Sequence, residues 1–177
     1  MNRGEYMLAP DKVQNEAMQK ENENYRFRAY LKGNADAEEL DSQFVRLHNE
    51  LFANYDCNKC RNCCKKCRGT IPVEDAWRVA LHLNMTEEEF VNLYLEKDTE
   101  DEDEYQTKHI PCDFLMDDGN CKLGDFKPEG CKLYPFTNQP GRLFSLYSFL
   151  DAVSICPVAF EICERLKEEY NFKKRFR

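Results

Sequence analysis

The sequence lacks several features that would place it in a familiar class. No apolar run reaches the roughly eighteen residues that a membrane-spanning helix needs. The first residues, "MNRGEYMLAPDKVQNEAM", carry acids and have no apolar core of the kind found in a secretory signal. The chain also has no glycine-rich nucleotide loop and no paired-carboxylate constellation. We therefore expect a cytoplasmic protein with no membrane span, in which thiols stay reduced.

The composition describes a compact, acidic chain whose charge is unevenly spread. Its 177 residues are 42% hydrophobic and 33% charged, which suits one domain able to bury a core. The net charge is −8, and residues 86–104 alone hold ten acids and one lysine. The last part of this acidic run, "EKDTEDEDEY" (96–105), we expect to be a solvated, mobile loop. Residues 59–68 instead hold five cations and no acid. Because cations offset the residual charge of metal-bound thiolates, we expect no nucleic-acid partner.

Helical periodicity dominates the pattern outside the cysteine-rich segments. Residues 37–51 place four apolar side chains at helical spacing after a capping Asp36, and residues 12–31 are also predicted to be helical. The segment "TIPVEDAWRVALHL" predicts a helix with Val73, Trp77, Ala80 and Leu81 on one face. Thr86 and Glu89 have the spacing of a capping box. Pro157 is expected to begin a final helix.

The predicted fold is mainly α with small, irregular β structure, in which helices pack around a cysteine-rich, loop-rich metal centre. Residues 110–136 alternate short apolar runs with turns and predict a hairpin, and "LFSLYSFL" (143–150) is predicted to be a strand. We divide the chain into a helical N-terminal extension at residues 1–52, which packs on a cysteine-rich domain at residues 53–177.

Five of the ten cysteines lie within "CNKCRNCCKKC", residues 57–67. Cys-x2-Cys pairs are typical of zinc sites. Cys57, Cys60, Cys63 and Cys67 also have the spacing of the bacterial ferredoxin run, without its following proline. Cys60, Cys64 and Cys67 have the spacing of radical S-adenosylmethionine enzymes, although no strand–helix repeat for a barrel follows. All three interpretations share a thiolate-bound metal. Since adjacent residues seldom point the same way, Cys63 and Cys64 favour two metals or a multinuclear centre.

The remaining cysteines divide between candidate ligands and a core residue. Cys112, Cys121, Cys131 and Cys156 lie in the loop-rich half, where ligands can converge. Cys163 shares a helical face with Phe160 and Leu166, and we predict that it packs in the core. The role of Cys67 stays open. His48, His82 and His109 are expected to be ordinary side chains, although His82 and His109 could serve as ligands.

Four segments together resemble a known family. "CNKCRNCC", "PCDFL", "CKLGDFKPEGCKLYPF" and "CP" occur in the order found in the YkgJ-like CxxCxxCC family, whose members are described as zinc- or iron-chelating domains. The resemblance runs from about Cys57 to Cys156, and the family usually has glycine at position 61 and arginine at position 132. It implies that the metal ligands are Cys57, Cys60, Cys63, Cys64, Cys112, Cys121, Cys131 and Cys156. Cys67 and Cys163 lie outside the family pattern.

Three functions remain open at this point. The first is a metal-binding protein, with an iron–sulfur cluster favoured over zinc and a redox or other protein as partner. The second is a protein-modifying enzyme, because the family resembles the cysteine-rich part of flagellin lysine methylases. The third is a zinc-stabilised interaction or metal-delivery module that uses the N-terminal helix or the acidic run. All-thiolate donors suit both zinc and iron.

Overall fold

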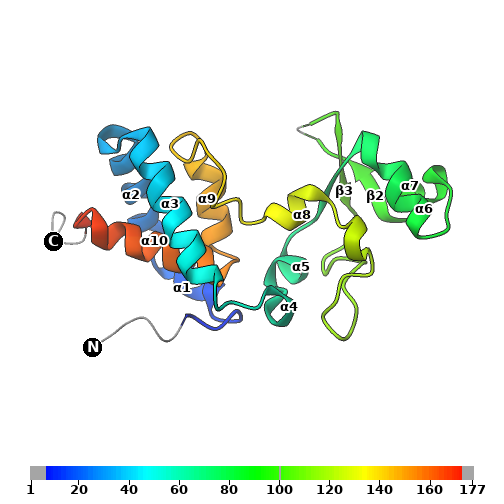
Figure 1. Ribbon diagram of the computed structural model, residues 1–177, viewed down its shortest axis with the longest axis horizontal. Helices are drawn as coiled ribbons and strands as arrows, with labels where there is room; N and C mark the ends of the chain where they lie inside the picture. The colour runs from blue at the N-terminus through cyan, green and yellow to red at the C-terminus, as the bar shows by residue number, and fades with distance from the viewer. Residues whose placement is uncertain (1–6, 100, 173–177) are drawn as a thin grey trace. The chain divides into compact units, whose positions relative to one another are not determined.

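The computed structural model describes residues 7–99 and 101–172, which form two compact units (Figure 1). Unit 1 comprises the chain up to Asp56 together with the chain from Pro135 onward, and unit 2 is the segment Cys57–Tyr134 between them. The fold is mainly helical with one small antiparallel sheet, so the predicted fold class is confirmed.

Unit 1 is built from helices that pack their apolar faces together. They are α1 (Val13–Gln19), α2 (Glu21–Asn34), α3 (Ala37–Phe52), α9 (Leu146–Val153) and α10 (Pro157–Glu169). Helix α3 begins as predicted, because Asp36 accepts hydrogen bonds from the backbone N–H groups of Glu38 and Glu39 at 3.0 Å. Its predicted apolar side chains are all buried. In the core, the rings of Phe44 and Phe149 meet nearly perpendicularly at 4.8 Å.

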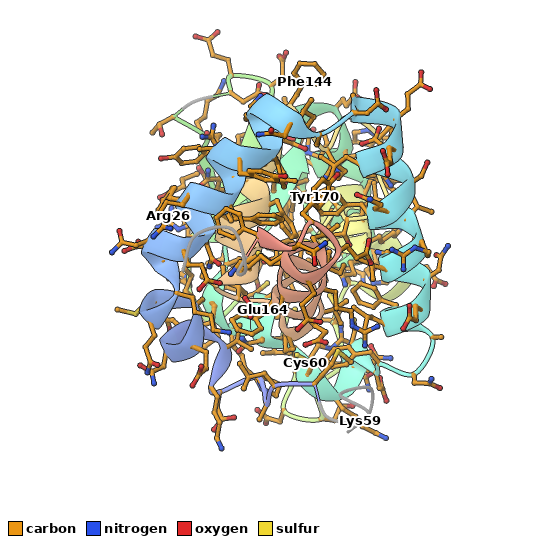
Figure 2. All side chains as sticks on the ribbon, turned by 90° about the vertical axis from the view of Figure 1, so that its left-hand side faces the viewer. Arg26, Lys59, Cys60, Phe144, Glu164 and Tyr170 are labelled. Carbon is orange, nitrogen blue, oxygen red and sulfur yellow. The ribbon has the colours of Figure 1, made fainter. Side chains whose placement is uncertain are left out.

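A buried ion cluster ties α10 to α2. The side chain of Lys167 is fully buried, and its Nζ donates to Glu23 at 2.8 Å, to Glu164 at 2.7 Å and to Asn24 at 2.6 Å. Glu164, which is labelled on α10 in Figure 2, also pairs with Lys20 at 2.7 Å. The lysine therefore satisfies its donors inside the unit, which is what burial of a charge requires.

Residues 143–150 form no strand, which makes the prediction for this segment wrong. The chain there turns and enters α9, and Leu146, Phe149 and Val153 lie on its buried face. Their spacing of three and four residues fits a helix, whereas short apolar runs do not distinguish helix from strand. Among the described residues, no single helix is long and apolar enough to cross a membrane. Helices α9 and α10 meet the length and composition test only as a pair, bent by 119°.

Unit 2 surrounds a small sheet with short helices. Its helices are α4 (Cys57–Cys60), α5 (Asn62–Lys66), α6 (Ala76–His82), α7 (Glu87–Tyr94) and α8 (Glu129–Leu133), with 3₁₀ turns η1 (Val73–Asp75) and η2 (Gly124–Phe126). The strands β1 (Thr70–Pro72), β2 (Leu95–Lys97) and β3 (Glu104–Thr107) pair antiparallel in the order β1-β3-β2. Strands β2 and β3 belong to the acidic run, so part of the predicted loop is a hairpin.

Helices α6 and α7 pack on the sheet through a partly unexpected face. The capping box of Thr86 and Glu89 is present, as predicted. Ala76, Val79 and Ala80 face the core, however, while Trp77 and Leu81 are 55% and 67% exposed. The prediction that Trp77 and Leu81 share the buried face is therefore wrong. Small alanine side chains let α6 lie close to its neighbours, so the larger side chains are left at the surface.

Candidate metal centre

The cysteine-rich segment folds as two short helical turns, α4 and α5, joined at Arg61 (Figure 1). The backbone N–H of Arg61 donates to the carbonyl of Cys57, and that of Cys67 donates to the carbonyl of Cys63 at 2.7 Å. After Cys67 the chain becomes extended and leads into β1. The side chain of Cys57 is exposed, whereas those of Cys63 and Cys64 are half-buried.

Arg61 makes the turn between α4 and α5 in a left-handed conformation. Its φ is +50°, a region that glycine adopts more readily than arginine. The tight turn implied by the family's usual glycine is thus present despite the substitution. The arginine side chain donates to the carbonyl of Gly119 and to Oδ1 of Asn58. These bonds hold the α4–α5 turn against the loop that precedes Cys121.

A backbone hydrogen bond joins the first cysteine segment to the second. The N–H of Cys112 donates to the carbonyl of Cys64 at 2.8 Å. Beyond it, Leu115 and Cys121 form an antiparallel bridge, and the N–H of Lys122 donates to the carbonyl of Phe114. The predicted hairpin in this region is therefore present as a short, tight one. At the base of this hairpin, Cys112 and Cys121 pack against the hydrophobic core of unit 2.

The third cysteine segment approaches the first beside β1. Helix α8 packs on β1, and it brings Cys131 so close to Gly69 that a Cβ atom on that glycine would lie 3.2 Å from the Cys131 sulfur. Nearby, the Cys67 thiol lies 4.0 Å from the Tyr134 hydroxyl, to which it donates. Cys67, whose role the sequence left open, is therefore next to the third segment.

These contacts define a group of six thiols in unit 2, which we call the six-thiol group: Cys63, Cys64, Cys67, Cys112, Cys121 and Cys131. Their electrostatic coupling agrees with the backbone contacts. The sulfur atoms of Cys63 and Cys64 are 4.0 Å apart, and the hydrogen bond between them lowers the pKa of Cys64 and raises that of Cys63. Lys127 and Arg61 further favour the Cys64 thiolate.

Burial raises the pKa of three further members of the group, Cys67, Cys112 and Cys131. It raises the pKa of Cys112 and of Cys131 to about 11, and the charge on Cys64 adds to both shifts. Lys127 lowers the pKa of Cys131, as it does that of Cys64. One lysine is thus close enough to act on thiols from two segments.

Four cysteines remain. Cys57 and Cys60 lie on α4, in the same unit as the six-thiol group and directly before α5 in the chain; Cys60 is labelled beside Lys59 in Figure 2. Cys156 belongs to unit 1, where it is buried and precedes the first residue of α10. Cys163 is buried on α10 with Phe160 and Leu166, as predicted for a core residue. Burial raises its pKa to about 12.

The three histidines have local partners. His48 Nδ1 is 2.8 Å from the Thr137 hydroxyl, and His109 Nδ1 is 2.9 Å from Asp113. The ring of His82 stacks on Phe126 with a centroid separation of 4.4 Å. These contacts agree with the expectation that the histidines are ordinary side chains.

The donor chemistry fits zinc or iron, since both take thiolate ligands. All ten cysteines are free thiols. Within residues 7–99 and 101–172, no three His, Cys, Asp or Glu side chains lie close enough to hold one metal ion as arranged. The residues therefore fit a metal by their donor chemistry, and ligation requires the sulfur atoms to draw closer. Sulfur movement of this sort is expected where metal binding and folding are coupled.

Free thiols from three segments of one small unit supply donors of the kind that a thiolate metal site uses. Residues 56–157, more than half of the chain, match the model of the CxxCxxCC family, described as "Putative zinc- or iron-chelating domain". The chain belongs to this family, which confirms the resemblance inferred from its motifs. It matches no curated protein and no solved structure.

Proposed function

We propose that unit 2 holds an iron–sulfur cluster through thiolates of the six-thiol group. The convergence of three cysteine-bearing segments carries this proposal. Cys64 is tied to Cys112 by a backbone hydrogen bond, and Cys131 lies against Gly69 just beyond Cys67. Six neighbouring thiols exceed the four that a single structural zinc ion takes. A cluster takes four thiolates, so the group can supply them even if one or two of its members serve other roles.

The charge around the thiols supports the same proposal. Ligation requires thiolates, and four ligating thiolates bring four negative charges into a half-buried site. Lys127 and Arg61 oppose part of that charge at Cys64. Because hydrogen bonds and nearby charge tune the reduction potential of a cluster, these cations would favour the reduced state. The chemistry that a bound cluster supplies is one-electron transfer, which would make another redox protein the partner.

The proposal is tested by purifying the full chain without air and recording its absorption from 300 to 600 nm with iron, zinc and sulfide analysis. A broad band near 400 nm with iron and acid-labile sulfide is expected. A colourless protein with stoichiometric zinc would overturn the cluster while keeping the thiolate site. Wild-type protein that retains neither metal after reconstitution would overturn both.

Cysteine variants then locate the site within the chain. Cys64→Ser and Cys131→Ser should each lower the bound iron by more than half, because they remove donors from different segments of the group. Cys163→Ser is the matched control, since that thiol is buried in unit 1. Equal iron in all three variants would mean that the six-thiol group is not the site.

A further inference from the structure

An exposed aromatic surface on unit 1 is not used by the metal centre. It consists of Tyr25, Arg28 and Lys32 on α2, of Phe144 in the turn before α9 and of Tyr147 in the first turn of α9, and we call it the α2–α9 surface. Phe144 is 80% exposed, Tyr147 is 55% exposed and Tyr25 is 40% exposed. Figure 2 shows Phe144 at the outer edge of the view, beyond α2. Clustered exposed aromatic side chains of this kind are typical of interaction sites.

The side chains of the α2–α9 surface already hold one another in place. Lys32 Nζ lies 5.2 Å from the centre of the Phe144 ring, and the Arg28 guanidinium lies 4.8 Å from that of Tyr147. The Tyr25 and Tyr147 rings are 5.9 Å apart and inclined at 56°. Positions 25, 28 and 32 share one helix face by their spacing. The surface is therefore preformed, which lowers the entropy cost of binding.

The charge of this surface is opposite to that of the whole chain. The charged members of the surface are two cations, Arg28 and Lys32, although the net charge of the chain is −8. The acids that act on Tyr25 are Glu21 and Asp151, at one end of the surface. At the other end Lys32 lies over Phe144, and the Asp41 carboxylate is occupied by the backbone N–H groups of Gly141 and Arg142. The complement of the two cations is a negatively charged partner that also carries an apolar side chain.

We infer that the α2–α9 surface docks an acidic segment of another protein that presents an aromatic or leucine anchor. Phe144 would receive the anchor, while Lys32 and Arg28 face the carboxylates. A nucleic acid fits less well, because base stacking uses open ring faces, whereas Arg28 covers one face of Tyr147 and Tyr25 leans on the same ring. A symmetric dimer would bring like charges together across the same patch.

The test is a fluorescence-polarisation titration of the full chain with three labelled probes. These are a 15-residue peptide of alternating Asp or Glu with Leu or Phe, the same peptide with Asn and Gln in place of the acids, and a 15-nucleotide oligo(dT). The acidic peptide should bind, and its affinity should weaken as salt rises. Phe144→Ala should weaken it roughly tenfold, as loss of a central aromatic anchor does, and Lys32→Gln should weaken it severalfold.

Trp77→Ala is the matched control, because Trp77 is an exposed aromatic side chain on unit 2, 55% exposed, and its loss should leave the affinity unchanged. Circular dichroism of each variant confirms folding, which an 80% exposed side chain such as Phe144 should not affect. The inference is overturned if the acidic peptide does not bind, or if the neutral peptide or oligo(dT) binds as tightly. Concentration-dependent dimerisation that Phe144→Ala abolishes would also overturn it.

Discussion

Substituting Gly69 by alanine should weaken metal binding while leaving the fold intact. The added Cβ would lie 3.2 Å from the Cys131 sulfur and 3.7 Å from Thr107 Cγ2, so the sulfur must give way by a few tenths of an ångström. Gly69 has no positive φ, and alanine therefore causes no backbone strain there. Metal–ligand distances tolerate only about 0.2 Å. Because the added Cβ restricts where the Cys131 sulfur can move when the thiols draw together on a metal, we expect roughly tenfold weaker metal binding, as for disturbed ligand positioning elsewhere.

The assay is a zinc competition titration with a chromophoric chelator, together with iron content after anaerobic reconstitution. Gly33→Ala is the control, because no atom lies within 4 Å of its added Cβ; it should leave metal binding unchanged and stabilise α2 by about 0.5–1 kcal/mol. Overpacking at Gly69 should cost the metal-free protein about 1 kcal/mol. Metal affinity equal to that of the wild type in Gly69→Ala would show that Cys131 is not a ligand.

Further predictions concern the helical unit. Lys167→Met should lower the free energy of unfolding by about 2 kcal/mol, because it removes the donor that Glu23, Asn24 and Glu164 share and leaves the buried Asn24 oxygen without it, although Glu164 keeps Lys20. Arg46→Gln, at a half-exposed ion pair, should cost under about 1 kcal/mol, and equal urea midpoints for the two would contradict the burial argument. Burial lowers the pKa of His48 below 6.5, so its stabilising contribution is intact above that pH and is lost as pH falls through the folded-state pKa. The free energy of unfolding, measured with urea, should therefore fall more from pH 7 to pH 5 in the wild type than in His48→Gln. Equal losses in the two proteins would contradict this role of His48. Cys163→Ala should keep full metal content yet lose about 1 kcal/mol of stability; metal loss would assign that thiol to the site.

Local patterns with a direct physical cause could be predicted from the sequence. The Asp36 cap, the Thr86 capping box and the start of α10 at Pro157 all depend on neighbouring backbone groups, and the structure contains each of them. The family resemblance is confirmed because it rests on cysteine motifs in a fixed order. The turn at residue 61 shows the limit of such reasoning, since Arg61 adopts the left-handed conformation without being glycine.

The errors arose where packing, rather than local preference, decides the structure. The apolar pattern of residues 143–150 fits a strand as well as a helix. Contacts within unit 1 decide in favour of α9. The strands β2 and β3 lie in an acidic run of low strand propensity, and β3 pairs both with β2 and with Thr70–Pro72, far from it in the sequence. The proximity of Cys67 to Tyr134 likewise depends on a contact between segments 67 residues apart.

The most direct test of the thiolate centre is X-ray absorption at the iron and zinc edges of the anaerobically purified chain. We predict a first shell made wholly of sulfur, at about 2.3 Å if the metal is zinc, and an additional iron neighbour if a cluster is present. A first shell dominated by nitrogen or oxygen at about 2.0–2.2 Å would contradict it, because the six-thiol group could not then be what holds the metal.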